Sequence, residues 1–166
     1  MNKVLTERWN SVVGQDDIIY CLGDFAYGRG TNPAKYFYRL NGEKHLVIGN
    51  HDGKETLDLP WTTINDTAEI KTHYGTIVLC HYAMKVWNKS HRGSWMLYGH
   101  SHLTLPEDSS MSFDVGVDGW NFTPVSLPQI SRKMEWKRNN PGYFNSVPKT
   151  RDEIFLFNQQ TNRQFL

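Results

Sequence analysis

The feature that most constrains this fold is a pattern that occurs four times: a short apolar run ends abruptly in residue types that can act as metal ligands. The four junctions are Gly23-Asp24, Gly49-Asn50-His51-Asp52, Cys80-His81 and Gly99-His100-Ser101-His102. Short apolar runs with β-branched members indicate buried strands. Because ligands collect beyond the carboxyl ends of strands in open α/β sheets, we expect the four junctions to converge on one point.

The side chains at these junctions comprise two carboxylates, one amide and four imidazoles. Imidazole suits zinc, iron, nickel or copper, whereas carboxylate and amide oxygens suit harder ions such as manganese. A mixed nitrogen and oxygen set predicts a catalytic first-row transition metal rather than a cysteine-rich zinc site or an all-oxygen calcium site. Each junction alone also fits an ordinary turn, so the prediction depends on their shared position at strand ends.

Apolar periodicity predicts the surrounding elements. Helices are expected at 4–13, from 33 to about 40, and from 126 to about 137; strands are expected at 18–22, 45–48, 69–73, 76–80, 95–98 and 113–117. The first two strands enclose a helix with short connections, which predicts a parallel pair. The strands at 69–73 and 76–80 predict a hairpin. Parallel and antiparallel strands with flanking helices indicate an α/β or α+β sandwich.

We expect one domain over residues 1–130, followed at 131–166 by a helix end and an irregular basic tail with one strand at 154–157. The tail has seven Lys/Arg against three Asp/Glu, but the whole chain has a net charge of +1, so nucleic-acid binding is not expected. No apolar run approaches the roughly 18–20 residues of a membrane span. Cys21 and Cys80 lie in apolar runs, and reduced buried thiols favour a cytoplasmic protein.

The motifs GDFAYG at 23–28, GNHD at 49–52, VLCHYAM at 78–84 and GHSH at 99–102 resemble, in order and spacing, those of the calcineurin-like metallophosphoesterase superfamily. Residues 85–102 and 114–127 resemble a small single-domain bacterial and phage branch. The resemblance implies a sandwich of two mixed β-sheets flanked by helices, with two divalent transition metal ions (Mn, Fe, Zn or Ni) at the sheet edge. It implies hydrolysis of a phosphate ester by a metal-activated water, with a diester favoured over a monoester. The expected substrate is a small or nucleotide-type phosphate ester.

The resemblance also implies metal-binding roles for five junction residues. Asp24 would bridge the two metals. Asn50, His81 and His100 would complete the ligands of the second metal, and His102 would bind the first metal.

Two further residues would act on the substrate. The resemblance implies that His51 faces the substrate as an acid or as a stabiliser of phosphate charge, and that Asp52 orients its ring. His91 and Arg92 lie in a polar segment before the strand at 95–98. An arginine there is a candidate phosphate contact, and a solvated loop is the alternative.

The sequence departs from the family at the first metal. Family members begin with a strand that ends in Asp-x-His, and both residues bind that metal; this sequence contains no Asp-x-His. Only Asp24 and His102 are then expected there, fewer than the three protein ligands of a usual catalytic zinc site. The chain is expected to be either a shortened form of a complete enzyme or a degenerate, weakly active or inactive metal-binding or interaction domain. The absent strand would leave a gap or an unpaired edge in one sheet.

Overall fold

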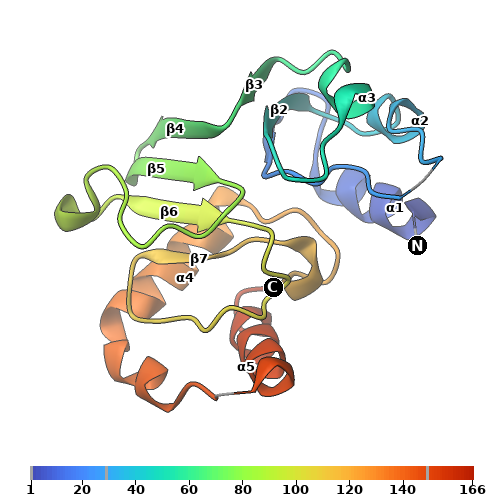
Figure 1. The fold of residues 1–166 in the computed structure, drawn as a ribbon. Coiled ribbons are helices and arrows are strands. Elements are labelled where there is room, and N and C mark those ends of the chain that lie inside the picture. The colour runs from blue at the N-terminus through green and yellow to red at the C-terminus, as the bar shows by residue number, and fades with distance from the viewer. Residues whose placement is uncertain (1, 29, 149) are drawn as a thin grey trace.

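The computed structural model describes residues 2–28, 30–148 and 150–166, and it confirms the predicted fold class, with two sheets and flanking helices (Figure 1). The strands are β1 (Ile18–Cys21), β2 (Glu43–Val47), β3 (Thr63–Asn65), β4 (Thr67–Thr72), β5 (Gly75–Cys80), β6 (Trp95–Tyr98) and β7 (Ser112–Asp114). The helices are α1 (Asn2–Val12), α2 (Ala34–Phe37), α3 (Lys54–Leu57), α4 (Leu127–Asn139) and α5 (Arg151–Arg163), and 3₁₀ turns are η1 (Ser90–Arg92), η2 (Val117–Gly119) and η3 (Pro141–Ser146).

The first sheet has the strand order β1-β2-β3 and is parallel throughout. Its parallel strands follow from helical connections, since α2 lies between β1 and β2 and α3 between β2 and β3. The second sheet is mixed: β4 and β5 form the predicted antiparallel hairpin, and β6 and β7 continue the order in parallel.

β1 is less buried than its apolar sequence predicts. It occupies one edge of the first sheet, and Ile18 is 63% exposed. By contrast, Leu46 and Val47 of the central strand β2 are fully buried. A continuous apolar run therefore marks both a central strand and an edge strand here, because the sequence does not specify which strand has a neighbour on each side.

The main core lies between the second sheet and α4. Ile77, Leu79 and Leu97 of the sheet pack in one cluster with Ile130 and Met134 of the helix. The helix begins as predicted, because the side chains of Ser126 and Gln129 form a capping box ahead of Leu127. This core fixes the strands whose carboxyl ends carry His81 and His100.

The C-terminal segment is not an irregular tail with a strand at 154–157, and that prediction is wrong. Residues 151–163 form α5, and residue 131 lies inside α4, so the expected boundary between a domain and a tail is not a structural one. One face of α5 buries Ile154, Asn158, Thr161 and Asn162. Because three of these four are polar, apolar periodicity does not reveal the helix. The sequence Thr150-x-x-Glu153 has the form of a capping box and indicates a helix start, although in the structure the Thr150 hydroxyl donates to the Glu153 carboxylate at 2.6 Å and neither side chain caps a backbone group of the described residues.

Two further expectations concern cysteines and membranes. Cys80 is buried, as predicted, whereas Cys21 is only half-buried; both are free cysteines. None of the described helices combines the length and the apolar character that crossing a membrane requires.

Candidate metal centre

The predicted convergence of strand ends occurs between the two sheets. Asp24 follows β1 and Asn50 follows β2 in the first sheet, while His81 follows β5 and His100 follows β6 in the second. In Figure 1 the arrowheads of β5 and β6 point toward the first sheet. The carboxyl ends of four strands therefore bring these side chains together.

His81 lies at the centre of this group and is 1% exposed. Its Nδ1 is 2.7 Å from the carbonyl oxygen of Leu22. Because a carbonyl oxygen only accepts hydrogen bonds, Nδ1 carries the ring proton and donates it, and Nε2 keeps a lone pair. That Nε2 lies 3.0 Å from Asn50 Oδ1, 3.1 Å from His100 Nδ1 and 3.5 Å from Asp24 Oδ2.

Four atoms that can each present a lone pair thus surround one position. The ligand atoms of Asp24, His81 and His100 all lie within 4.8 Å of one another. Two ligands of a tetrahedral ion bound at about 2.0–2.1 Å lie roughly 3.3 Å apart, close to the separations around His81 Nε2. Asp24, His81 and His100 therefore form a group that can hold a metal ion, and the Asn50 oxygen lies beside it.

Two glycines allow the strand ends to approach so closely. A Cβ atom on Gly23 would lie 2.5 Å from His81 Nδ1, and one on Gly49 would lie 2.4 Å from Asp24 Oδ1. The turn after β1 also requires unusual backbone, with φ values of 88° at Gly23 and 55° at Asp24. Glycine adopts such values readily, whereas aspartate is one of the few other residues that tolerate them.

Asp52 does not orient the His51 ring, and this is a correction to the sequence prediction. Its carboxylate is buried and accepts hydrogen bonds from the backbone N–H groups of Asp24 at 2.8 Å, Phe25 at 2.9 Å and Gly49 at 2.8 Å. Those N–H groups belong to the turns after β1 and β2. Asp52 therefore joins the two turns that carry Asp24 and Asn50.

Replacing Asp52 with alanine is expected to lower the free energy of unfolding by about 2–4 kcal/mol, because three backbone donors lose a charged acceptor. Urea unfolding measures this loss. Asp58→Ala is the matched control, since its exposed ion pair with Lys54 contributes about 0–1 kcal/mol. Equal losses in the two variants would contradict the role assigned to Asp52.

His51 lies beside the cluster without joining it. Its backbone N–H donates to Asp24 Oδ1 at 2.8 Å, while its ring packs on Tyr27 with centroids 4.4 Å apart. Both side chains are exposed. Asn50 and His51 are neighbours in the sequence, yet the Asn50 oxygen lies in the cluster and the His51 ring is open to solvent.

His102 lies outside the cluster of Asp24, His81 and His100. Its Nδ1 is 2.6 Å from Asp118 Oδ2, and its side chain is 72% exposed. A carboxylate in this position holds the proton on Nδ1 and leaves Nε2 free to bind a metal. Asp118 lies in η2, sixteen residues after His102, and was not among the site residues predicted from the sequence.

The structure does not bring His91 and Arg92 to this centre. Both belong to η1, which directly precedes β6, whereas His100 follows the other end of that strand. Four strand residues span roughly 13 Å. His91 and Arg92 are exposed side chains at the opposite end of the sheet, so the fold does not support the expected phosphate contact.

A cavity of about 1040 Å³ adjoins the centre, and its lining includes Asp24, His81, His100 and His102. Every residue from 17 to 24 also lines it. Because successive residues of a strand point to opposite faces, this unbroken series means that the cavity follows the free edge of β1. Among the described residues no strand pairs with this side of β1, which fits the expected gap or unpaired edge.

Comparison with known proteins places the chain in a family. No family model matches it. A protein of Methanocaldococcus jannaschii, described as uncharacterized protein MJ1445, is 30% identical over 144 residues, covering 81% of this chain and 76% of the archaeal protein. The chain belongs to the MJ1445 family.

Other proteins are more distantly similar to the chain. Gene 66 proteins of the Mycobacterium phages L5 and D29 are each 23% identical to the chain over 150 residues, covering 70% of it and 72% and 75% of the phage proteins. The crystal structure of AQ665, a protein of unknown function from Aquifex aeolicus, matches with a TM-score of 0.61 at 19% identity. That match covers 79% of this chain and 83% of AQ665, so the two share a fold.

Proposed function

We propose that this member of the MJ1445 family is a metal-dependent phosphoesterase, similar to the calcineurin-like metallophosphoesterases, that hydrolyses a phosphodiester in preference to a monoester. The observation that carries the proposal is the convergence of lone pairs from Asp24, Asn50 and His100 on His81 Nε2. Asp24, His81 and His100 present ligand atoms close enough together to share one metal ion. The order and spacing of the four motifs support the same activity.

Each residue of the centre has a distinct task in this proposal. Asp24, Asn50, His81 and His100 hold a divalent ion of Mn, Fe, Zn or Ni. Such ions, when bound, polarise a phosphate and lower the pKa of a water molecule. The exposed His51 ring would protonate the leaving oxygen or neutralise phosphate charge, a task worth about 10²–10⁴-fold in rate.

A second ion would need ligands beyond Asp24 and His102. The cavity along the free edge of β1 supports the idea that a further strand completes the site, because its lining includes both residues. A strand ending in Asp-x-His and paired with β1 would supply two ligands at that position. The competing proposal is a metal-binding domain with little or no activity, and the small number of ligands at the first metal, Asp24 and His102, favours it.

Hydrolysis of bis(p-nitrophenyl) phosphate with Mn²⁺ tests the proposed function. The chain itself is expected to be nearly inactive, and the chain with a fused N-terminal strand ending in Asp-x-His at least about 100-fold more active, because two-metal clamping contributes several kcal/mol. Asp24→Ala should abolish that gain. No activity in the extended chain with any of the four metals would contradict the proposal.

Within the extended chain, His51→Asn separates chemistry from metal binding. We expect kcat to fall at least about tenfold while metal content stays unchanged. Loss of metal in this variant, with activity restored by added Mn²⁺, would mean that His51 is a ligand. Strong activity in the unextended chain that Asp24→Ala abolishes would mean that the ligand set of the first metal is already complete.

A further inference from the structure

The loop that carries His100 has an unfavourable backbone. His100, His102 and Leu103 have φ values of 60°, 46° and 61°, the left-handed region that residues with a Cβ rarely adopt. Three such residues within four positions persist only where the surrounding structure fixes them. The contacts that fix this loop therefore bear on where His100 points.

Leu103 is fixed through both of its backbone groups. Its N–H donates to Asp114 Oδ2 at 3.1 Å, and its carbonyl accepts from Asn158 Nδ2 at 2.8 Å. Asp114 Oδ2 also accepts from the Ser101 hydroxyl, and Asn158 Nδ2 also donates to the carbonyl of Leu105 at 2.9 Å. Asp114 and Asn158 are 2% and 1% exposed, so water does not replace these bonds.

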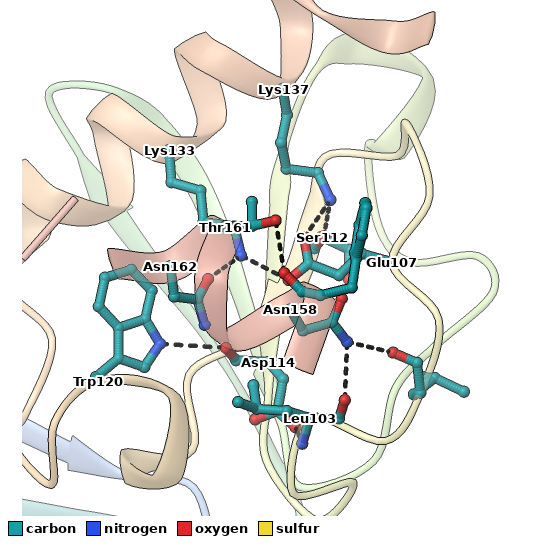
Figure 2. Close-up of polar contacts among 12 residues, drawn as sticks. Leu103, Glu107, Ser112, Asp114, Trp120, Lys133, Lys137, Asn158, Thr161 and Asn162 are labelled. Carbon is teal, nitrogen blue, oxygen red and sulfur yellow. Dashed lines mark hydrogen bonds and ion pairs between the residues drawn. The ribbon is translucent and has the colours of Figure 1, made fainter. Parts of the chain in front are cut away.

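A buried charge cluster fixes the same segment four residues further on (Figure 2). Lys133 and Lys137 of α4 reach Glu107, at 2.6 Å to Oε1 and 3.2 Å to Oε2. Lys133 also donates to the Asn162 side chain of α5, and Lys137 to the carbonyl of Ser112 at 2.7 Å. Both lysines are fully buried.

The two C-terminal helices thus converge on the segment that follows the metal ligand. Asn158 and Asn162 come from α5, and both lysines come from α4. Leu103 is also enclosed on its side-chain face, because a Cβ on Gly119 would lie 2.7 Å from Leu103 Cδ1 and from Asn162 Nδ2. This end of the loop has little room for an alternative conformation.

We propose that Asn158 and Asp114 are positioning residues of the metal centre, which hold the loop 99–103, with its left-handed residues His100, His102 and Leu103, in the conformation that directs His100 Nδ1 toward His81. The inference depends on the metal site of the proposed function and is independent of the reaction performed there. It makes α5 part of the metal site, although Asn158 itself does not touch the ligand atoms.

Titration of the full chain with Co²⁺, followed by calorimetry and by the visible absorption of the bound ion, tests this inference. Asn158→Ala is expected to weaken Co²⁺ binding about 10–100-fold, the usual effect of removing groups that orient a ligand. The absorption spectrum should also change, because the angle of the His100 ring changes. Ile154→Ala, one turn earlier on the buried face of α5, should keep the wild-type affinity and spectrum.

Thermal unfolding of each variant separates positioning from stability. If Asn158→Ala is as destabilised as Ile154→Ala yet binds Co²⁺ as the wild type does, Asn158 has only a structural role and the inference is wrong.

Ser101→Ala, which removes one donor to Asp114, serves as a milder variant if Asn158→Ala does not fold, and it should weaken binding at least about threefold. Wild-type affinity in Ser101→Ala would then contradict the inference. Failure of the wild type itself to bind Co²⁺ would contradict both the metal site and this inference.

Discussion

Replacing Glu107 with glutamine is expected to lower the free energy of unfolding at pH 7 by about 3–5 kcal/mol, the usual cost of breaking a buried ion pair from one side. Glu107 is the carboxylate that both Lys133 and Lys137 contact, and all three side chains are 0–1% exposed. Glutamine keeps the size of the side chain but leaves two buried ammonium groups without a counter-charge. The control is Glu135→Gln, on the exposed face of α4, the helix that carries both lysines. It should change the free energy of unfolding by no more than about 0.5 kcal/mol.

The Glu107→Gln loss should also depend on pH. Burial lowers the pKa of Lys133 from 10.5 to about 8 in the folded protein, although Glu107 opposes the shift. Between these two values the unfolded chain binds more protons than the folded one, so the contribution of Lys133 to stability rises with pH. Without Glu107 the pKa of Lys133 in the folded protein falls further. The pH range over which Lys133 makes stability rise with pH therefore extends to lower pH.

Chemical unfolding at pH 7 and pH 9.5 measures both effects. The deficit of Glu107→Gln relative to the wild type should be smaller at pH 9.5, because Lys133 is then buried in its neutral form. A deficit below about 1 kcal/mol at pH 7, or a deficit that grows with pH, would contradict the stabilising role assigned to this cluster.

The group of Asp24, His81 and His100, which could hold a metal ion, could be predicted from the sequence because its members follow strands. Asp24, His81 and His100 follow apolar runs, and the carboxyl ends of the strands of both sheets meet between the two sheets. The role of Asp52 could not be predicted in this way. Its partners are backbone N–H groups, which every residue carries and no sequence pattern distinguishes.

The C-terminal helices show why the remaining features were missed. Lys133 and Lys137 have the spacing and charge of a solvated helix face, yet both are buried against Glu107, which lies 26 and 30 residues earlier. The buried face of α5 is likewise polar, because Asn158 and Asn162 bond to the loop and to Lys133. Hydrophobic periodicity identifies a buried helix face only where the buried side chains are apolar. Here the buried side chains are polar and bond to specific partners.

Metal content after extensive dialysis tests the central claim most directly. We expect the wild-type chain to retain about one equivalent of Mn, Fe, Zn or Ni, and a second only weakly, since one ligand set has four members and the other has two. His81→Ala should bind the metal at least about 100-fold more weakly, because the three other ligand atoms surround His81 Nε2. This loss exceeds the usual effect of removing a group that only orients a ligand. His73→Ala, an exposed histidine in the hairpin between β4 and β5, should retain the wild-type content. A wild-type chain that holds none of these metals, or a His81→Ala chain that holds as much as the wild type, would contradict the metal centre.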